Sequence, residues 1–315
     1  MICIHLKNTN PFFCLAAEEY LLKNFREDIF MLWQSEDTVV VGKHQNAMAE
    51  INYPFVRENN ITVARRISGG GTVFHDSGNV NFSFIKNVSS PAEISFKLFT
   101  EPVVEALEKL GIKATTSGRN DLLVEGMKIS GNAEHVYKNR VLHHGTLLYN
   151  SDLENLGQAI KVVSGKYESK AVQSNRSRVA NISGFLPRPM KIKNFMEFML
   201  DVQLQKEGNR FYELRKDDIS TISELANDKF VRWDWCFGYS PKYTFRNSVE
   251  IEGKKLSIHL EVKKGMIENA ILGGDLFSQT EAIKVDEKLL GKRHFYDEVK
   301  RVLATDNEAL VYAFF

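Results

Sequence analysis

Three consecutive glycines, Gly69 to Gly71, lie between two arginines and a His-Asp pair in the segment RRISGGGTVFHD, residues 65–76. Glycine lets a ligand approach the main chain closely, and the amides of such a turn can bind an anion. The guanidinium groups of Arg65 and Arg66 are suited to grip phosphate or carboxylate. We therefore predict a pocket for a small molecule that carries negative charge, although a triple glycine alone is as often a flexible turn.

Three further polar segments, each with its own glycine, are predicted to share this pocket. Their sequences are GRND at 118–121, KISGNA at 128–133 and HHGTLL at 143–148. A glycine inside a strand often marks the close approach of a ligand or of another backbone. Because the glycine run matches neither GxGxxG nor GxxxxGK[ST], no Rossmann or P-loop mechanism is predicted.

The periodicity of apolar residues predicts the elements that position these segments. The predicted strands are 1–8, 29–33, 38–41, 122–124, 127–136 and 141–149. The predicted helices are 15–25, 90–110, 152–161 and 191–206. Short turns join the last three strands, so this part is predicted to be a mostly antiparallel meander. Residues 162–190 are predicted to form a long polar loop.

A second, smaller unit follows a break in the apolar pattern at 237–243. It is predicted to contain strands 248–251, 255–262 and 266–273 and helices 283–289 and 294–303. We place the boundary near residue 245, so that the predicted domains are 1–244 and 245–315. The fold class is α/β in the broad α+β sense, with mixed, mainly antiparallel sheets in the first domain and a small α+β second domain.

Composition limits the classes of function. The chain has 315 residues, of which 43% are hydrophobic and 26% charged, with a formal net charge of +1. This length suits two domains, and the balanced charge argues against broad binding to nucleic acid. No apolar run is long enough for a membrane span, and residues 1–8 do not form a signal peptide. Three widely spaced cysteines fit a reducing compartment, so we expect a cytoplasmic protein, by default a monomer.

The four polar motifs, in this order, resemble those of lipoate–protein ligases. The resemblance extends back to Asn10-Pro11 and the acids Glu18 and Glu19, and forward to LEVKKG at 260–265, which is similar to the accessory domain of bacterial ligases. It thus covers nearly the whole chain. It implies the α/β catalytic fold shared with biotin–protein ligases, followed by the accessory domain.

The reaction that the resemblance implies has two steps. Lipoate and ATP form lipoyl-AMP and pyrophosphate with Mg²⁺ nearby, and the lipoyl group then passes to a lysine of an acceptor protein. The implied acceptors are the lipoyl domains of 2-oxoacid dehydrogenase E2 subunits and the glycine-cleavage H protein.

The resemblance also assigns roles to residues. Lys128 is the predicted catalytic residue, because an ammonium group between a carboxylate and the α-phosphate neutralises both. Asp121 is the predicted magnesium ligand. The predicted ATP- and lipoyl-AMP-binding residues are Arg66, Gly70, Gly71, Thr72, Val73, Phe74, Asn120, Asp121 and Lys128. The predicted lipoate-binding residues are Leu15, Arg66, Ser68, Gly69, Gly70, His75, Lys128, Gly131, His144, Gly145 and Thr146.

Each assignment has a structural alternative. Lys128 could be a solvated strand lysine, Asp121 a turn cap, and the two arginines members of surface ion pairs. His75 is more simply a hydrogen-bonded structural histidine, and Leu15 is more simply part of a core. SNRSRV at 174–179 resembles the adenylate-binding loop of the family, but Asn175 departs from the pattern. Only the existence of a closing loop is therefore predicted there.

Two other functions stay open. An ATP-independent lipoyl or octanoyl transferase would use the same pocket, although Cys236 is poorly placed for transfer through sulfur. A non-catalytic lipoate-binding module would keep the pocket and lack the reaction.

Overall fold

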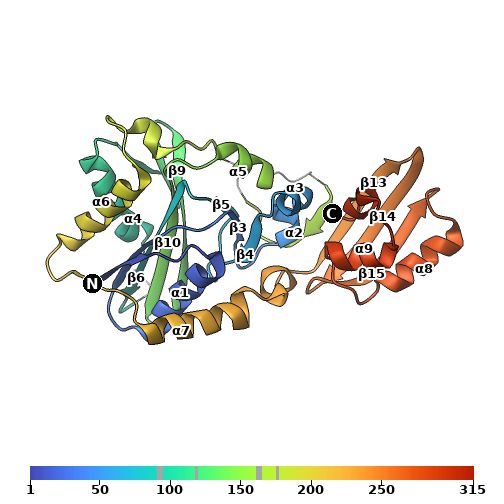
Figure 1. Cartoon of the computed structure of the whole chain (residues 1–315), viewed down its shortest axis with the longest axis horizontal. Coiled ribbons are helices and arrows are strands. Elements are labelled where there is room, and N and C mark those ends of the chain that lie inside the picture. The colour runs from blue at the N-terminus through green and yellow to red at the C-terminus, as the bar shows by residue number, and fades with distance from the viewer. Residues whose placement is uncertain (91–94, 118–119, 161–164, 175–176) are drawn as a thin grey trace.

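The computed structural model describes residues 1–90, 95–117, 120–160, 165–174 and 177–315. A larger part of the molecule holds the N-terminus, and a smaller part holds the last three long strands and the helices that follow them (Figure 1). Within the described residues, no helix combines the length and apolar character needed to cross a bilayer.

The larger part is built on an eight-stranded sheet with the order β12-β1-β2-β6-β10-β9-β8-β7. Its first three strands are parallel and the remaining pairs are antiparallel. The strands are β1 (Ile2–Leu6), β2 (Ile29–Trp33), β6 (Asn79–Asn87), β7 (Thr115–Ser117), β8 (Asp121–Val124), β9 (Met127–Tyr137), β10 (Arg140–Leu148) and β12 (Arg210–Phe211).

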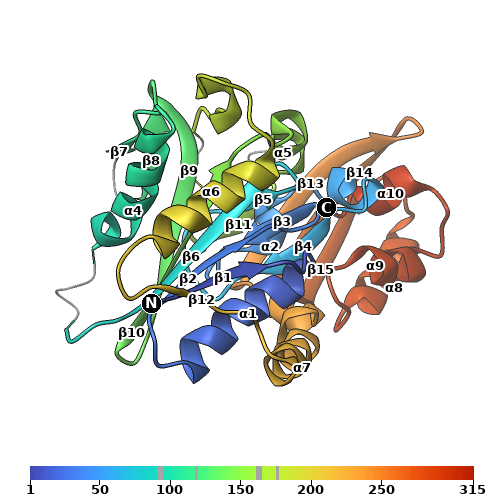
Figure 2. The ribbon, with the colours of Figure 1, turned by 60° about the vertical axis from the view of Figure 1, so that its left-hand side comes forward.

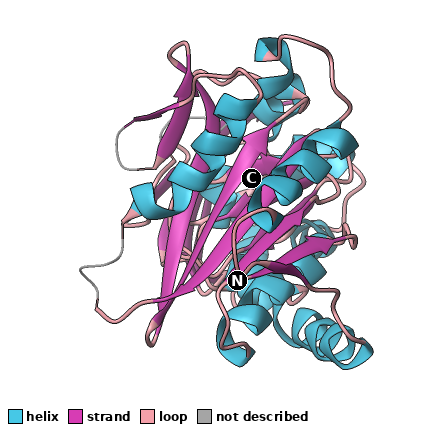
Figure 3. Cartoon of the chain, turned by 90° about the vertical axis from the view of Figure 1, so that its left-hand side faces the viewer, coloured by secondary structure: helices cyan, strands magenta, loops and turns pink. Residues whose placement is uncertain are grey.

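The two faces of this sheet bury different cores, because side chains alternate along each strand. Val80, Phe82 and Phe84 of β6 pack on the face covered by α4 (Phe96–Lys109) and α6 (Ile192–Leu204). The opposite face packs against α1 (Pro11–Asn24) and α7 (Lys216–Leu225). Figures 2 and 3 show these helices packed along the strands. Polar side chains of β6 also lie on the α1 face, which is where the site forms.

A three-stranded sheet carries the glycine loop. It consists of β3 (Thr38–Val41) between a parallel β4 (Thr62–Arg65) and an antiparallel β5 (Val73–His75). Because β4 ends at Arg65 and β5 begins at Val73, the residues between them form the connection at one end of this sheet. The short helices α2 (Ala47–Glu50) and α3 (Tyr53–Glu58) follow β3.

The smaller part is an antiparallel meander of β13 (Tyr243–Ile251), β14 (Lys254–Lys263) and β15 (Met266–Gly274). Three helices pack on it: α8 (Gln279–Leu289), α9 (Tyr296–Leu303) and α10 (Glu308–Tyr312). One further strand, β11 (Tyr167–Ser169), comes from much earlier in the chain and pairs with β13. The sheet of the smaller part therefore includes residues from before the predicted boundary.

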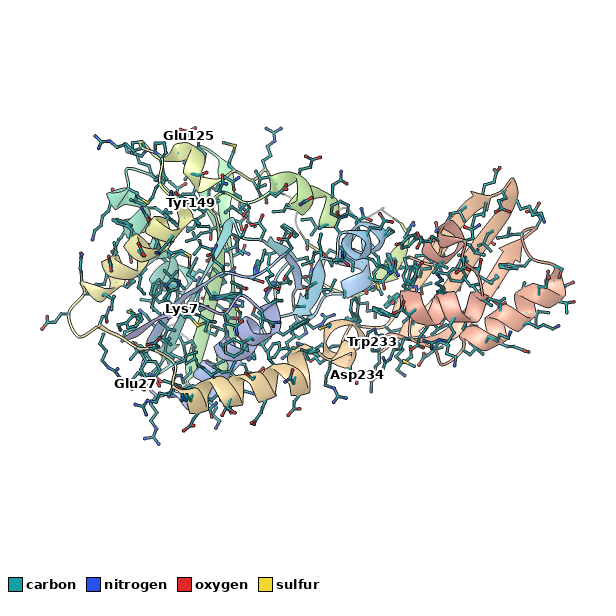
Figure 4. The ribbon with its side chains drawn as sticks, viewed as in Figure 1. Lys7, Glu27, Glu125, Tyr149, Trp233 and Asp234 are labelled. Carbon is teal, nitrogen blue, oxygen red and sulfur yellow. The ribbon has the colours of Figure 1, made fainter. Side chains whose placement is uncertain are left out.

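The junction between the two parts is packed rather than extended. Two π-helical turns, Ala226–Phe230 and Asp234–Gly238, lead from α7 to β13. Trp233 and Asp234 lie at this junction (Figure 4). One hydrophobic core continues from the three-stranded sheet, α2 and α3 into the sheet and helices of the smaller part.

Most predicted elements are found, with errors at their ends. Strands 29–33 and 38–41 are confirmed at both ends, whereas α1 begins at Pro11 because the Asn10 side chain caps it. The helix start at Ser90-Pro91 is wrong, because α4 begins at Phe96 after an extended Ser95. Pro91 itself lies outside the described residues. Helices 152–161 and 191–206 are confirmed with shorter limits as α5 (Leu153–Ala159) and α6.

The predicted long loop at 162–190 is wrong in part. It contains β11 and a 3₁₀ turn, Ile182–Phe185. A three-residue strand of polar sequence carries no periodic signal, so only its pairing with β13 reveals it.

Candidate active site

Two adjoining cavities lie where the large sheet meets the glycine loop. The narrow cavity has a volume of about 250 Å³ and the wide cavity about 560 Å³. The residues that line both are Thr72, Val73, Lys128, Gly131, Thr146, Val172, Gln173, Ser174 and Ser177. The shared lining makes the two cavities suitable for one bent ligand or for two ligands that react with each other.

The structure brings nearly all predicted site residues to these cavities. Those that line the narrow cavity are Leu15, Arg66, Gly70, Gly71, Thr72, Val73, His75, Asn120, Asp121, Lys128, Gly131, His144, Gly145 and Thr146. Phe74 lines the wide cavity. Ser68 and Gly69 line neither, but both accept hydrogen bonds from Arg66. Gly118 and Arg119 of the GRND motif lie outside the described residues, as do Asn175 and Arg176.

Lys128 projects from β9 between the two cavities. Its Nζ lies 2.9 Å from Asp121 Oδ1, and both side chains are about one-quarter exposed, at 23% and 24%. The contact is an ion pair. A Cβ at Gly131 would lie 3.0 Å from this amine, so glycine leaves room for it. A freely solvated strand lysine does not describe this residue.

The backbone of Lys128 is held by hydrogen bonds with Arg178 and Ala180, which lie beside β9. Its N–H donates to Arg178 O at 2.8 Å, and its carbonyl accepts from Ala180 N at 3.0 Å. The segment that contains the predicted closing loop therefore also holds the strand that carries the predicted catalytic amine.

Arg66 holds the glycine loop from inside. Its Nη2 donates to Gly69 O at 2.6 Å and to Gly71 O at 2.7 Å, and its Nη1 donates to Val40 O at 3.1 Å. Gly70 between these two carbonyls has a φ of +86°, which favours glycine. Burial lowers the pKa of Arg66 to about 10. Most of its donors thus shape the loop rather than point to a ligand.

Arg65 is also buried, but it faces the junction. Its partners are five backbone carbonyls, at Gly42, Lys43, Gln45, Trp235 and Cys236, and the hydroxyl of Ser240. Burial lowers the pKa of this guanidinium to about 10 as well. The surface ion pair considered for both arginines is therefore wrong, because both side chains are buried on main-chain carbonyls.

A buried hydrogen-bonded chain orients His144. Its Nδ1 lies 2.9 Å from the Glu18 carboxylate, and its Nε2 lies 2.6 Å from Ser68 Oγ. Because a carboxylate only accepts, Nδ1 carries a proton that it donates to Glu18, and Ser68 Oγ shares a hydrogen bond with Nε2. His143 faces the opposite side of β10, where it stacks on Phe99 at 4.8 Å. The sequence could not distinguish these two faces, and it gave no role to Glu18.

His75 is not the hydrogen-bonded structural histidine that was the simpler prediction. Its Nδ1 is buried and has no hydrogen-bond partner within the described structure. Burial lowers its pKa to about 3, with a smaller contribution from the charge of Arg66. His75 is therefore a neutral imidazole in the wall of the narrow cavity.

A cluster missed from the sequence fastens the described part of the closing segment to the glycine loop. Ser174 Oγ accepts from Thr72 N at 2.8 Å and from Gln45 Nε2 at 3.1 Å, and it donates to Glu50. Burial raises the pKa of Glu50, while the hydrogen bonds from Ser174 and Thr72 oppose this rise. The partners are far apart in the chain, so no local pattern indicates the contact.

The fold and the site together place this chain in the class of enzymes that have a ligase fold of the biotin/lipoate type. Residues 10–203 match the family model of the lipoyl protein ligase A/B catalytic domain, and residues 240–311 match that of the bacterial lipoate protein ligase C-terminus. The chain belongs to the family of lipoate–protein ligases. The predicted fold class and enzyme class are thereby confirmed.

Individual relatives agree with this assignment. Lipoate–protein ligase 1 of Staphylococcus aureus (strain Mu50) is 41% identical over 298 residues, which are 94% of this chain and 91% of the relative. A bipartite lipoate protein ligase of Thermoplasma acidophilum, described with its E2 lipoyl domain, has a TM-score of 0.65 and 25% identity, covering 76% of this chain and 96% of its own. Lipoate–protein ligase A bound with ATP gives the same score and identity, covering 76% and 98%.

Proposed function

We propose that this chain activates lipoate with ATP to lipoyl-AMP and transfers the lipoyl group to a lysine of a lipoyl domain. The observation that supports this most directly is the place of Lys128, whose side chain lines both cavities beside the glycine loop. The relatives' names point the same way, since one was solved with ATP and another was studied with its E2 lipoyl domain.

In the first step, a carboxylate oxygen of lipoate attacks the α-phosphorus of ATP, and pyrophosphate leaves. The two reactants are anions that repel each other until positive charge lies between them. In this proposal the acyl chain occupies the narrow cavity and the nucleotide the wide one, so the reacting groups meet at Lys128. The ammonium group then exchanges its contact with Asp121 for contacts with both substrates.

Asp121 fits the role of a magnesium ligand. Its Oδ1 contacts the Lys128 ammonium at 2.9 Å, so it becomes available to a cation when that ammonium turns to the substrates. Within the described residues, no group of three or more His, Cys, Asp or Glu side chains could hold a metal on its own. Magnesium would thus be shared between Asp121, with Asn120 nearby, and phosphate oxygens of ATP, whose charge it would neutralise.

In the second step, the neutral amine of the acceptor lysine attacks the acyl carbon, AMP leaves, and the amine loses a proton. Lipoyl-AMP is a mixed anhydride that water would destroy, so the site has to be covered until the acceptor arrives. The segment 165–174, which lines the wide cavity and is fastened by Ser174, is suited to this task.

We propose the domains 1–244 and 245–315 predicted from the sequence. β13 begins at Tyr243, just before this boundary, and β11 is a strand that the first domain lends to the sheet of the second. We also propose that the predicted ATP- and lipoate-binding residues that line the cavities act in these roles, that Ser68 and Gly69 act through their hydrogen bonds from Arg66, and that E2 subunits and the H protein are acceptors. The expectation of a cytoplasmic monomer that binds neither nucleic acid nor membrane stays a prediction.

Mass spectrometry of an apo lipoyl domain tests the proposal. The domain is incubated with the protein, ATP, Mg²⁺ and lipoate, and we expect one lipoyl modification and lipoate-dependent release of pyrophosphate. Modification without ATP when the acyl group is supplied already activated, as a thioester, and free lipoate is omitted, would instead indicate the transferase alternative. Lipoate binding with no pyrophosphate release and no modification would indicate the non-catalytic module.

A further inference from the structure

One strand of the large sheet, β6, carries a row of polar side chains, of which Asn81 lines the narrow cavity. Val80, Phe82 and Phe84 of β6 point into the core under α4 and α6, so the residues between them point to the other face. Two of these, Asn81 and Ser83, are 2% and 0% exposed. A strand face of this kind needs a partner for every polar atom.

The Ser83 hydroxyl both donates and accepts a hydrogen bond, whereas one polar atom of Asn81 has no partner in the described structure. Ser83 Oγ donates to Glu18 at 2.6 Å and accepts from Trp33 Nε1 at 3.1 Å. Asn81 Oδ1 accepts from Asn79 Nδ2 at 2.9 Å. Its Nδ2 is buried and has no hydrogen-bond partner in the described structure, while Asn81 lines the narrow cavity.

The strand register places Asn81 at a definite distance from the reacting end. Gly131 of β9 donates to Thr146 of β10, Thr146 is paired with Asn81, and Asn81 is paired with Trp33 of β2. All four residues line the narrow cavity, and Gly131 lies beside the Lys128 amine. Two strand spacings, about 10 Å in all, therefore separate the Lys128 end from Asn81.

Lipoate has a matching shape. Four methylene groups separate its carboxylate from a five-membered ring that contains two sulfur atoms. With its carboxylate at Lys128, an extended chain across the strands brings this ring to Asn81. A divalent sulfur is a weak hydrogen-bond acceptor, whereas a methylene group accepts nothing.

We propose that Asn81 Nδ2 donates a hydrogen bond to a dithiolane sulfur, and that Asn81 thereby determines the preference for lipoate over acids without sulfur. This inference rests on the proposed function. An acid that lacks sulfur leaves the buried N–H unpaired, and sites built with a polar group reject ligands that cannot satisfy it. The neutral His75, also with an unpaired nitrogen, adds a second polar group to the cavity wall.

The test compares three acids that separate sulfur from shape. They are lipoate, 5-cyclopentylpentanoate, which keeps the ring size without sulfur, and octanoate, which has neither ring nor sulfur. ATP–pyrophosphate exchange gives kcat/KM for each acid, and calorimetry gives binding in the absence of ATP. For the unmodified protein we expect roughly a three- to tenfold preference for lipoate over the cyclopentyl acid, as one weak hydrogen bond provides.

The variant Asn81→Leu removes the donor at similar volume. We expect it to bring the ratio of kcat/KM for lipoate to kcat/KM for the cyclopentyl acid close to one. The change in kcat/KM for octanoate should be smaller. Val40→Ala is the matched control, since Val40 also lines the narrow cavity and has no side-chain donor. This control is expected to lower kcat/KM for both ring acids and to keep their ratio.

Two results would overturn the inference. Equal use of the two ring acids by the unmodified protein is one, and it needs no variant to fold. An unchanged ratio in Asn81→Leu is the other. Failure of the proposed function is distinguishable from both, because the unmodified protein would then show no exchange with any of the three acids.

Discussion

The glycine loop and the segment 165–174, here called the cover segment, line the same wide cavity but are held in different ways. The glycine loop is held by buried Arg66, whose donors reach carbonyls on both sides of Gly70. The cover segment is attached at its two ends, by the pairing of β11 with β13 and by the Ser174 hydroxyl. The glycine loop, which fixes the geometry of the cavity, is thus held by a buried side chain. The cover segment, which is proposed to admit the substrates, is held by few hydrogen bonds.

The first attachment of the cover segment belongs to the smaller part of the molecule. Tyr167 pairs with Phe245, and Lys166 Nζ donates to Phe315 O at 2.9 Å. A displacement of the C-terminal sheet would therefore move the cover segment, while Arg66 would keep the glycine loop attached to β3 of the three-stranded sheet. The two sides of the cavity are thus held by different parts of the molecule, which the following variants can separate.

The largest effect is expected at Lys128, where both sides of the cavity meet. Lys128→Ala should lower lipoate-dependent pyrophosphate release by a factor of about 1,000, because the removed charge stabilises a reaction between two anions. Folding should largely remain, as measured by thermal melting, whereas calorimetry should show weaker lipoate binding, because the carboxylate loses its contact with the ammonium. Lys138→Ala, a lysine in an exposed turn, is the control. Turnover close to normal in Lys128→Ala would contradict the assigned role.

Arg65 and Arg66 provide a matched pair of variants that test the side of the cavity formed by the glycine loop. Arg66→Lys loses the fork that holds Gly69 O and Gly71 O, so we expect about a hundredfold loss of kcat/KM and a loss of stability of about 2–4 kcal/mol. Arg65→Lys should cost similar stability, because Arg65 is as buried, but it should cost less activity. Denaturant unfolding and exchange kinetics measure both. Equal activity losses would show that the junction contacts of Arg65 matter as much as the loop.

These residues also show what could be predicted from the sequence. The glycines and arginines were found because chemistry that binds anions needs their types in a local order, and Lys128 was found because the segment KISGNA resembles a motif of the family. Glu18, Glu50 and Ser174 were missed, because each acts through a partner that only the fold brings near. The buried environment of Arg65 could not be predicted either, since its carbonyl partners carry no side-chain signal.

The pH dependence of stability should distinguish the C-terminal part, to which the cover segment is attached, from the side of the cavity that the glycine loop forms. His294 is buried, Tyr243 OH lies 2.7 Å from its Nδ1, and Phe315 stacks on its ring. Burial lowers its pKa to about 4. Because the unfolded chain binds the proton near pH 6.5, stability is full above pH 6.5 and falls as the pH drops toward 4. Between pH 7.5 and 5 this residue alone should account for about 2 kcal/mol.

The variant His294→Gln should therefore flatten the acid limb of stability, measured by urea unfolding at several pH values. It should not abolish that limb, because His75, on the side of the glycine loop, has a pKa lowered to about 3 and contributes in the same direction. His259→Gln, on the same sheet, is the control. An acid limb as steep in His294→Gln as in the unmodified protein would show that His294 does not titrate in this way.

The smallest effect is expected at the second attachment of the cover segment. Ser174→Ala removes the hydroxyl that joins Thr72 N, Gln45 and Glu50, so the segment should open more often while the glycine loop keeps its shape. We expect the KM for ATP to rise about three- to tenfold, kcat to change little, and lipoyl-AMP to be lost to hydrolysis faster. Ser169→Ala is the matched control, because its hydroxyl accepts only from Ala171 N within the cover segment. If both variants behave alike, or if Ser174→Ala lowers kcat as strongly as Arg66→Lys, the cover segment is not the more weakly held side of the cavity.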